Sequence, residues 1–157
     1  MYTKIMVPLD GSELAECVLS HVEAFISQCQ IRTIVFVRII EPTFSMTSGK
    51  NPDKLQKEIE SRENERKSAA EKYLKQVIAK MPEGDAKIEI EVMVGRAADK
   101  LADYAENNDI DLILMATHGR SGVGRWVRGS VADRILRAAS IPVLMVRAPG
   151  TVRDRMA

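Results

Sequence analysis

Residues 1–12 read MYTKIMVPLDGS, a short apolar run that ends in a turn made by Asp10, Gly11 and Ser12. A run of this length followed by turn residues is typical of a buried strand. Pro8 falls at the end of the predicted strand, where its missing N–H is tolerated. We therefore predict a strand that stops at the Asp10 turn and a new element that starts at Ser12.

The residues after this turn predict a helix and then a second strand. Between Ser12 and Gln28, apolar side chains recur at spacings of three and four, as in an amphipathic helix packed on a sheet. These side chains belong to Leu14, Ala15, Val18, Leu19, Val22, Phe25 and Ile26. Residues 32–40 are rich in valine and isoleucine without clean alternation, which indicates a strand covered on both faces.

A long helix is predicted to start at Asn51 and Pro52, which suit an N-cap and the first helical position. Its second half carries the apolar side chains of Ala69, Ala70, Tyr73, Leu74, Val77, Ile78 and Met81. Residues 60–68 are all polar, so this part of the helix cannot pack against a core. We expect residues 43–66 to form a flexible insertion and helix extension.

The remaining elements complete an α/β pattern. Residues 86–94 alternate apolar with mostly charged side chains, which predicts an edge strand. The elements predicted after it are a helix over 97–107, a strand over 111–116, a helix over 130–139 and a strand over 142–146. Right-handed crossovers assemble such elements into a doubly wound parallel sheet. We predict one Rossmann-like α/β domain over residues 1–147, with five strands in the order 3-2-1-4-5, and a C-terminal tail over 148–157.

Composition excludes several classes of protein. The 157 residues are 45% hydrophobic and 29% charged, as in an ordinary globular domain. Lys and Arg number 23 against 22 Asp and Glu, so the net charge of +1 gives no general attraction to nucleic acid or to anionic membranes. No apolar run approaches the ~20 residues that span a bilayer, and the start lacks the plan of a signal peptide. We expect a cytoplasmic protein.

The most informative segment reads ATHGRSGVGRWVRGS over residues 116–130 and contains four glycines. Glycines let a backbone approach a phosphate closely and turn its N–H groups inward. Ser130 opens the last helix, and the free N–H groups of a helix start suit an anion. The glycines are also compatible with a simple turn, and Ser130 with an ordinary helix cap. In doubly wound sheets, ligands bind at the strand ends where this segment and the Asp10 turn meet.

This segment resembles the nucleotide loop of the universal stress protein family, Gly-x2-Gly-x9-Gly-Ser/Thr. Here it reads Ala116-x2-Gly119-x9-Gly129-Ser130, so an alanine replaces the first glycine. An alanine still exposes its N–H, although its methyl group intrudes slightly. Further segments that resemble the family are residues 5–13, 94–97 and 141–146. Together the similar segments span the chain to about residue 147.

The resemblance implies an ATP-binding protein, with Mg²⁺ accompanying the nucleotide. It implies that Asp10 lies against the adenosine part of the ligand and that Ile39 contacts the adenine. The implied nucleotide contacts are Pro8, Leu9, Asp10, Ile39, Met115, Ala116, His118, Gly119, Arg120, Gly122, Gly129, Ser130, Val131 and Ala132. From the residues alone, Asp10 suits ribose hydroxyls or a metal, and it equally suits a role in capping the first helix.

No catalytic or metal-ligating set is predicted. The P-loop pattern is absent, and no base is evident beside the phosphate loop, so any ATP hydrolysis should be slow. ATP would then act mainly as a conformational ligand of a stress-response switch. Residues 142–146 form an apolar last strand that predicts a homodimer through this edge. The alternative is a nucleotide-free interaction module in which Ala116 marks a decayed site.

Overall fold

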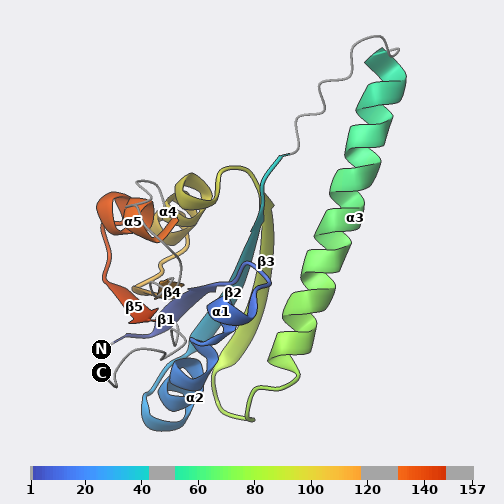
Figure 1. Cartoon of the computed structure of the whole chain (residues 1–157). Helices are drawn as coiled ribbons and strands as arrows, with labels where there is room; N and C mark the ends of the chain where they lie inside the picture. The colour runs from blue at the N-terminus through green and yellow to red at the C-terminus, as the bar shows by residue number, and fades with distance from the viewer. Residues whose placement is uncertain (1, 43–51, 118–130, 148–157) are drawn as a thin grey trace, which may run out of the picture.

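The computed structural model describes residues 2–42, 52–117 and 131–147. Its elements in chain order are β1 (Lys4–Pro8), α1 (Glu13–Glu16), α2 (Leu19–Gln28), β2 (Thr33–Ile40), α3 (Pro52–Ile78), β3 (Lys87–Val94), α4 (Ala97–Asn107), β4 (Leu112–Thr117), α5 (Val131–Ala138) and β5 (Val143–Arg147). The strands form one parallel sheet in the order β3-β2-β1-β4-β5 (Figure 1). The predicted fold class and strand order are therefore confirmed.

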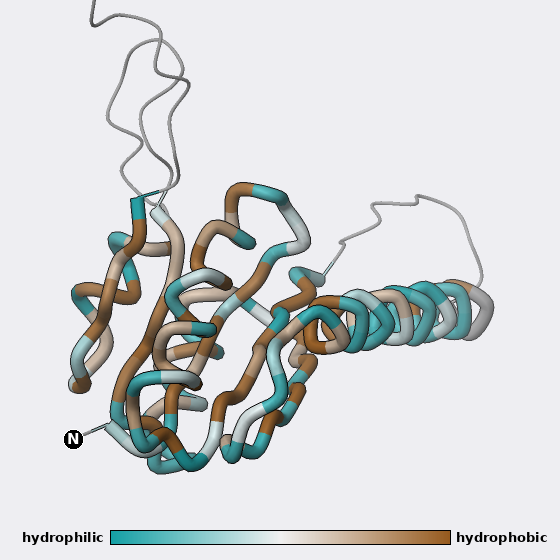
Figure 2. The backbone as a smooth tube through the Cα atoms, turned by 90° about the horizontal axis from the view of Figure 1, so that it is seen from below, coloured by the Kyte–Doolittle hydropathy of each residue, from teal (hydrophilic) through white to brown (hydrophobic). Residues whose placement is uncertain are grey.

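Helices cover both faces of this sheet. Alternate residues of each strand point to opposite faces, so each strand contributes side chains to both helical layers. In β1, Ile5 and Val7 join a core cluster with α2 and α3, whereas Met6 joins a second cluster with α4 and α5. The strands carry most of the hydrophobic colour in Figure 2, and α3 is mainly hydrophilic. Fully buried side chains lie on both faces, for example Phe36 on the side of α2 and α3 and Ile113 on the side of α4 and α5.

The first helix differs from its predicted form. Instead of one helix over residues 12–28, α1 and α2 are separated at Cys17 and Val18. The N–H of Cys17 donates to the Leu14 carbonyl and that of Val18 to the Ala15 carbonyl, which is the i to i−3 pattern of a tighter turn. Leu14 of α1, which we predicted to pack on the sheet, is 45% exposed, whereas its neighbour Ala15 packs against the core.

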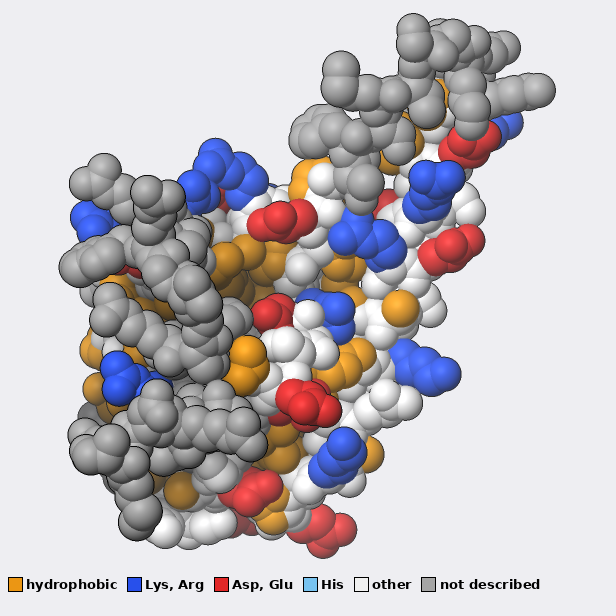
Figure 3. Space-filling view, viewed as in Figure 1, with side chains coloured by type: hydrophobic (Ala, Val, Ile, Leu, Met, Phe, Trp, Pro, Cys, Tyr) orange, Lys and Arg blue, Asp and Glu red, His pale blue; other side chains and the backbone are white. Residues whose placement is uncertain are grey.

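Helix α3 is buried along one line of its second half. Ala70, Leu74 and Val77 are buried at spacings of four and three, while Ala69, predicted to be buried, lies beside this line and is exposed. The first turns of α3 extend beyond the sheet, as predicted for the polar half (Figure 1). Figure 3 shows acidic and basic side chains interspersed along this helix, which is typical of a solvated face.

The order of the strands shows where the chain reverses its direction of winding along the sheet. From β1 the chain builds β2 and β3 on one side, and then crosses back to build β4 and β5 on the other. The reversal point of a doubly wound sheet leaves a crevice at the carboxyl ends of the flanking strands. The prediction that residues 86–94 form an edge strand is confirmed, and β5 forms the opposite edge.

Candidate nucleotide site

Two hydrogen bonds show which way the backbone N–H and C=O groups point at the end of β2. Leu9 N–H donates to the Val37 carbonyl at 2.9 Å, and Gly95 N–H donates to the Ile40 carbonyl at 3.0 Å. Successive residues of a strand direct their backbone polar groups to opposite neighbours, so Val37 and Ile39 face β1 whereas Ile40 faces β3. Because β1 ends opposite Val37, the N–H and C=O of Ile39 point into the space beyond the end of β1.

The Asp10 turn borders this space on the β1 side. The Asp10 carboxylate accepts hydrogen bonds at Oδ1 from the N–H of Ser12 at 2.9 Å and from its hydroxyl at 2.6 Å. Ser12 Oγ in turn accepts from the N–H of Ala15 at 3.1 Å, so Ser12 is the N-cap of α1. Asp10 therefore shapes the turn before the helix and is itself exposed at the strand end.

The other described site residues lie at the ends of β4 and the start of α5. Met115 is buried, and Ala116 is half-buried and pairs with Val146 of β5. Val131 and Ala132 open α5. The structure thus brings the predicted residues of β1, β2, β4 and α5 to one edge of the sheet. The remaining predicted contacts, which lie outside the described residues, are His118, Gly119, Arg120, Gly122, Gly129 and Ser130.

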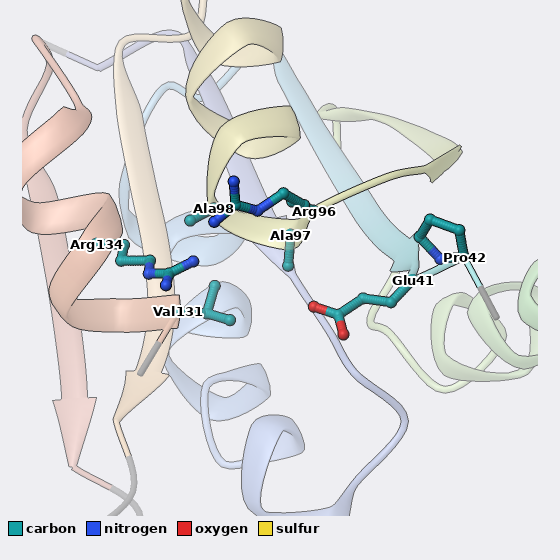
Figure 4. Close-up of a pocket in the computed structure, with 7 residues that line it drawn as sticks. All are labelled: Glu41, Pro42, Arg96, Ala97, Ala98, Val131 and Arg134. Carbon is teal, nitrogen blue, oxygen red and sulfur yellow. The ribbon is translucent and has the colours of Figure 1, made fainter. Parts of the chain in front are cut away.

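A cavity of about 290 Å³ opens at the same edge of the sheet, on the side of α4 and α5. Its lining consists of Glu41, Pro42, Arg96, Ala97, Ala98, Val131 and Arg134. In Figure 4 the side chains of Glu41 and Arg134 reach toward each other from opposite walls, with Ala97 and Val131 between them. Among the predicted contacts, Val131 alone is part of this lining, so the cavity borders the predicted residues rather than coinciding with them.

The walls of this cavity have opposite electrostatic character. Two helices, α4 and α5, begin at it, and helix N-termini carry partial positive charge. Arg96, paired with Asp99 at 3.4 Å, and Arg134 add two guanidinium groups, while Glu41 supplies a carboxylate from the β2 side. This arrangement favours an anionic ligand that also presents an N–H or O–H donor.

Sequence reasoning missed the charged lining of the cavity. Arg96 stands in the segment of residues 94–97 that resembles the family, and the turn before it requires Gly95, whose φ is +148°. A Cβ at Gly95 would lie 2.9 Å from Lys100 Cε. The position of Arg96 directly after Gly95 in this segment was therefore a signal that the sequence offered. Glu41 and Arg134 are brought to the cavity by tertiary structure alone.

Comparison with known proteins agrees with this fold. The model of the universal stress protein family matches residues 1–147. The chain belongs to the universal stress protein family. A universal stress protein of Methanocaldococcus jannaschii is 28% identical to this member, over 94% of this chain and 96% of that protein. The solved structure of that relative superposes with a TM-score of 0.78 at 23% identity, covering 96% of this chain and 99% of that chain.

Two further solved structures hold adenine nucleotides. A universal stress protein in complex with cAMP has a TM-score of 0.60 at 19% identity, covering 94% of this chain and 98% of that chain. An Arabidopsis thaliana family member with AMP bound has a TM-score of 0.57 at 14% identity, covering 98% of this chain and 97% of that chain. These likenesses show that this universal stress protein has the fold on which those two proteins bind their nucleotides.

The described parts of this universal stress protein contain neither a metal-ligand cluster nor a membrane-spanning helix. Within residues 2–42, 52–117 and 131–147, no three His, Cys, Asp or Glu side chains are grouped closely enough to hold a metal ion. Of the helices in those ranges, none combines the length and the hydrophobicity that crossing a membrane requires.

Proposed function

We propose that this universal stress protein binds an adenine nucleotide at the carboxyl ends of β1, β2 and β4, with ATP and Mg²⁺ as the physiological ligand. The observation that carries the proposal is the space beyond the end of β1, into which Ile39 directs a backbone donor and an acceptor. Adenine offers a matching acceptor at N1 and a donor at N6. The adenine nucleotides held by two relatives of this fold support the same ligand class.

The rest of the ligand follows from the position of the base. The ribose would lie against Asp10, whose exposed carboxylate is an acceptor for the sugar hydroxyls. The phosphates would lie at the start of α5, with contacts from Gly119, Gly129 and Ser130 and from the N–H groups of Val131 and Ala132. Arg134, one turn into α5 and on the wall of the adjoining cavity, adds positive charge on the phosphate side.

The nucleotide in this proposal is a conformational ligand rather than a substrate of rapid turnover. Efficient phosphoryl transfer needs a positioned base or water-orienting group and charges that neutralise the transition state. The sequence supplies no P-loop lysine for that purpose. We propose slow hydrolysis at most, and a cytoplasmic switch in which ATP alters the surface that the protein presents to its partners.

The switch is proposed to be a homodimer formed by pairing of β5 across the two copies. Ile113 N–H donates to the Pro142 carbonyl at 3.0 Å, so by alternation the N–H groups of Val143 and Met145 face the open side of the strand. Leu144 is 41% exposed beside them. An apolar edge strand with open backbone donors is a template for pairing with a second strand.

Substitution of Asp10 tests the proposed ribose contact. We expect Asp10→Ala to raise the Kd for ATP about tenfold, because hydrogen bonds to the ribose and the turn bonds to Ser12 are both lost. Asp10→Asn keeps an acceptor at Oδ1, so its Kd should rise only about threefold. Isothermal titration calorimetry measures both, with Asp103→Ala on the exposed surface of α4 as the matched control. If the Asp10→Ala protein binds ATP with wild-type affinity, Asp10 does not contact the nucleotide.

A further inference from the structure

Arg38 joins three segments that are far apart in the sequence. It lies on β2, one residue before Ile39, and its side chain is half-buried on the face of the sheet covered by α2 and α3. Its Cζ lies 4.9 Å from the centroid of the Tyr73 ring on α3, a cation–π distance. On its other side the guanidinium touches the Asp10 turn, since a Cβ added to Gly11 would lie 2.6 Å from Arg38 Nη1.

The contact with Gly11 is specific to the conformation of the turn. Gly11 has a φ of +85°, in the left-handed region that favours glycine. A side chain there would be strained and would also displace the guanidinium of Arg38. The turn that presents Asp10 is therefore packed directly against Arg38, with no side chain between them.

Tyr73 links the same cluster back to α1. Its hydroxyl donates to Glu16 Oε1 at 2.9 Å. Burial raises the pKa of the Tyr73 hydroxyl, and the hydrogen bond and charge of Glu16 raise it further. The charge of Arg38 lowers this pKa and that of Asp10 raises it. The phenol thus lies within the electrostatic reach of the carboxylate that we place against the ribose.

A second bond ties α3 to the end of β2. Arg66 Nη1 on α3 donates to the Glu41 carbonyl at 2.8 Å, directly after the strand that carries Ile39. Helix α3 is therefore held to both the Asp10 turn and the end of β2, the two structures that border the space beyond β1. If α3 changes position, its exposed outer face can present that change to a partner.

We propose that Arg38 is a positioning residue of the nucleotide site, which holds the Asp10 turn in its binding conformation and transmits occupancy of the site to α3 through Tyr73. The inference rests on the proposed function. A nucleotide that restrains Asp10 also restrains Gly11 and the guanidinium packed against it. Because the guanidinium stacks on Tyr73, the restraint extends to α3.

Tyrosine NMR tests this inference directly. The chain has three tyrosines, and each reports on a different region: Tyr2 precedes β1 at the amino end of the sheet, Tyr104 lies on α4 on the opposite face, and Tyr73 lies in the cluster. Protein carrying ¹³C at the tyrosine ring carbon that bears the hydroxyl is titrated with ATP and Mg²⁺. We expect the Tyr73 resonance to shift on binding more than those of Tyr2 and Tyr104.

Arg38→Met removes the guanidinium while keeping a long apolar chain. We expect it to raise the Kd for ATP about threefold to tenfold, the scale of one such contact, and to abolish the ATP-dependent shift of Tyr73. Arg32→Met, an exposed arginine just before β2, is the matched control and should respond like wild type. Arg38→Lys keeps the charge and should restore part of the Tyr73 response. It also serves as the test variant if Arg38→Met fails to fold.

The outcomes separate this inference from the proposed function. If wild-type protein binds ATP but Tyr73 does not move, or if both Arg38 variants match wild type in Kd and in the Tyr73 shift, the role of Arg38 is overturned while nucleotide binding stands. If wild-type protein binds no nucleotide, the proposed function fails, and the role of Arg38 fails with it.

Discussion

Replacing Gly129 with leucine is expected to abolish nucleotide binding, with the Kd for ATP raised more than about 100-fold, or about 2.7 kcal/mol. In the proposed site, Gly129 immediately precedes the serine at the start of α5, where the phosphates approach the backbone. A leucine side chain would occupy the space that a phosphate needs, and it would disfavour any left-handed conformation there. Calorimetric titration with ATP and Mg²⁺ measures the loss.

Two further variants make this result specific. Gly124→Leu changes a glycine outside the predicted contacts, and we expect its Kd to stay within about threefold of wild type. Ala116→Gly restores the first glycine of the family pattern, and we expect it to tighten binding about twofold to fivefold by removing a methyl group from the phosphate approach. Unchanged affinity in Gly129→Leu would refute the placement of the phosphates.

Disruption of the β5 edge is expected to convert the protein from a dimer to a monomer. Met145→Pro removes an N–H that faces the open edge, while the backbone groups that pair with β4 belong to the alternate residues. Leu144→Lys places a charge on the exposed edge, a common means of blocking strand pairing. We expect either change to raise the dimer dissociation constant more than about 100-fold, because strand pairing and apolar burial are lost together.

Light scattering after size-exclusion chromatography measures the mass of each protein. Wild-type protein should have twice the chain mass of 17.5 kDa, and the two variants should have the chain mass itself. Leu14→Lys is the matched control, since Leu14 is 45% exposed and belongs to α1 rather than to this strand. A wild-type protein that is monomeric at micromolar concentration, or variants that stay dimeric, would rule out pairing through β5.

The fold could be predicted because each helix and strand leaves its own local pattern of apolar and polar residues in the sequence. Apolar runs for central strands, alternation in residues 86–94 and helical spacing in residues 97–107 each identify an element without knowledge of the others. The division of the first helix was not predictable, because it depends on i to i−3 hydrogen bonds at Cys17 and Val18. Such a tightening leaves no mark in the spacing of apolar residues.

The candidate site was predictable in part, for a related reason. Asp10 and Ile39 stand at strand ends, and strand ends can be located from the sequence. Arg38, Glu41 and Arg134 gave no comparable signal, because arginine and glutamate are common on solvated surfaces. Arg38 meets Tyr73 because β2 packs against α3 on one face of the sheet, and Glu41 and Arg134 line one cavity because α5 packs on the opposite face, so these contacts are visible only in the folded structure.

The stacking of Arg38 on Tyr73 connects α3 to the nucleotide site of the proposed switch. Residues 60–68 have a composition that serves solvation rather than packing, and Figure 3 shows charges of both signs along α3. A helix tied to the ligand site through Arg66 and Tyr73 and exposed on its outer face is suited to present ligand-dependent changes to a partner. The Tyr73 measurement above determines whether α3 responds in this way.

Calorimetric titration of the wild-type protein with ATP and with GTP, each with Mg²⁺, tests the central claim most directly. The donor and acceptor of Ile39 match adenine, whereas guanine presents the opposite polarity at the same positions, so we expect ATP to bind with a Kd of roughly micromolar magnitude. GTP should bind at least about tenfold more weakly. Absence of ATP binding, or equal affinity for the two nucleotides, would contradict an adenine site beside Ile39.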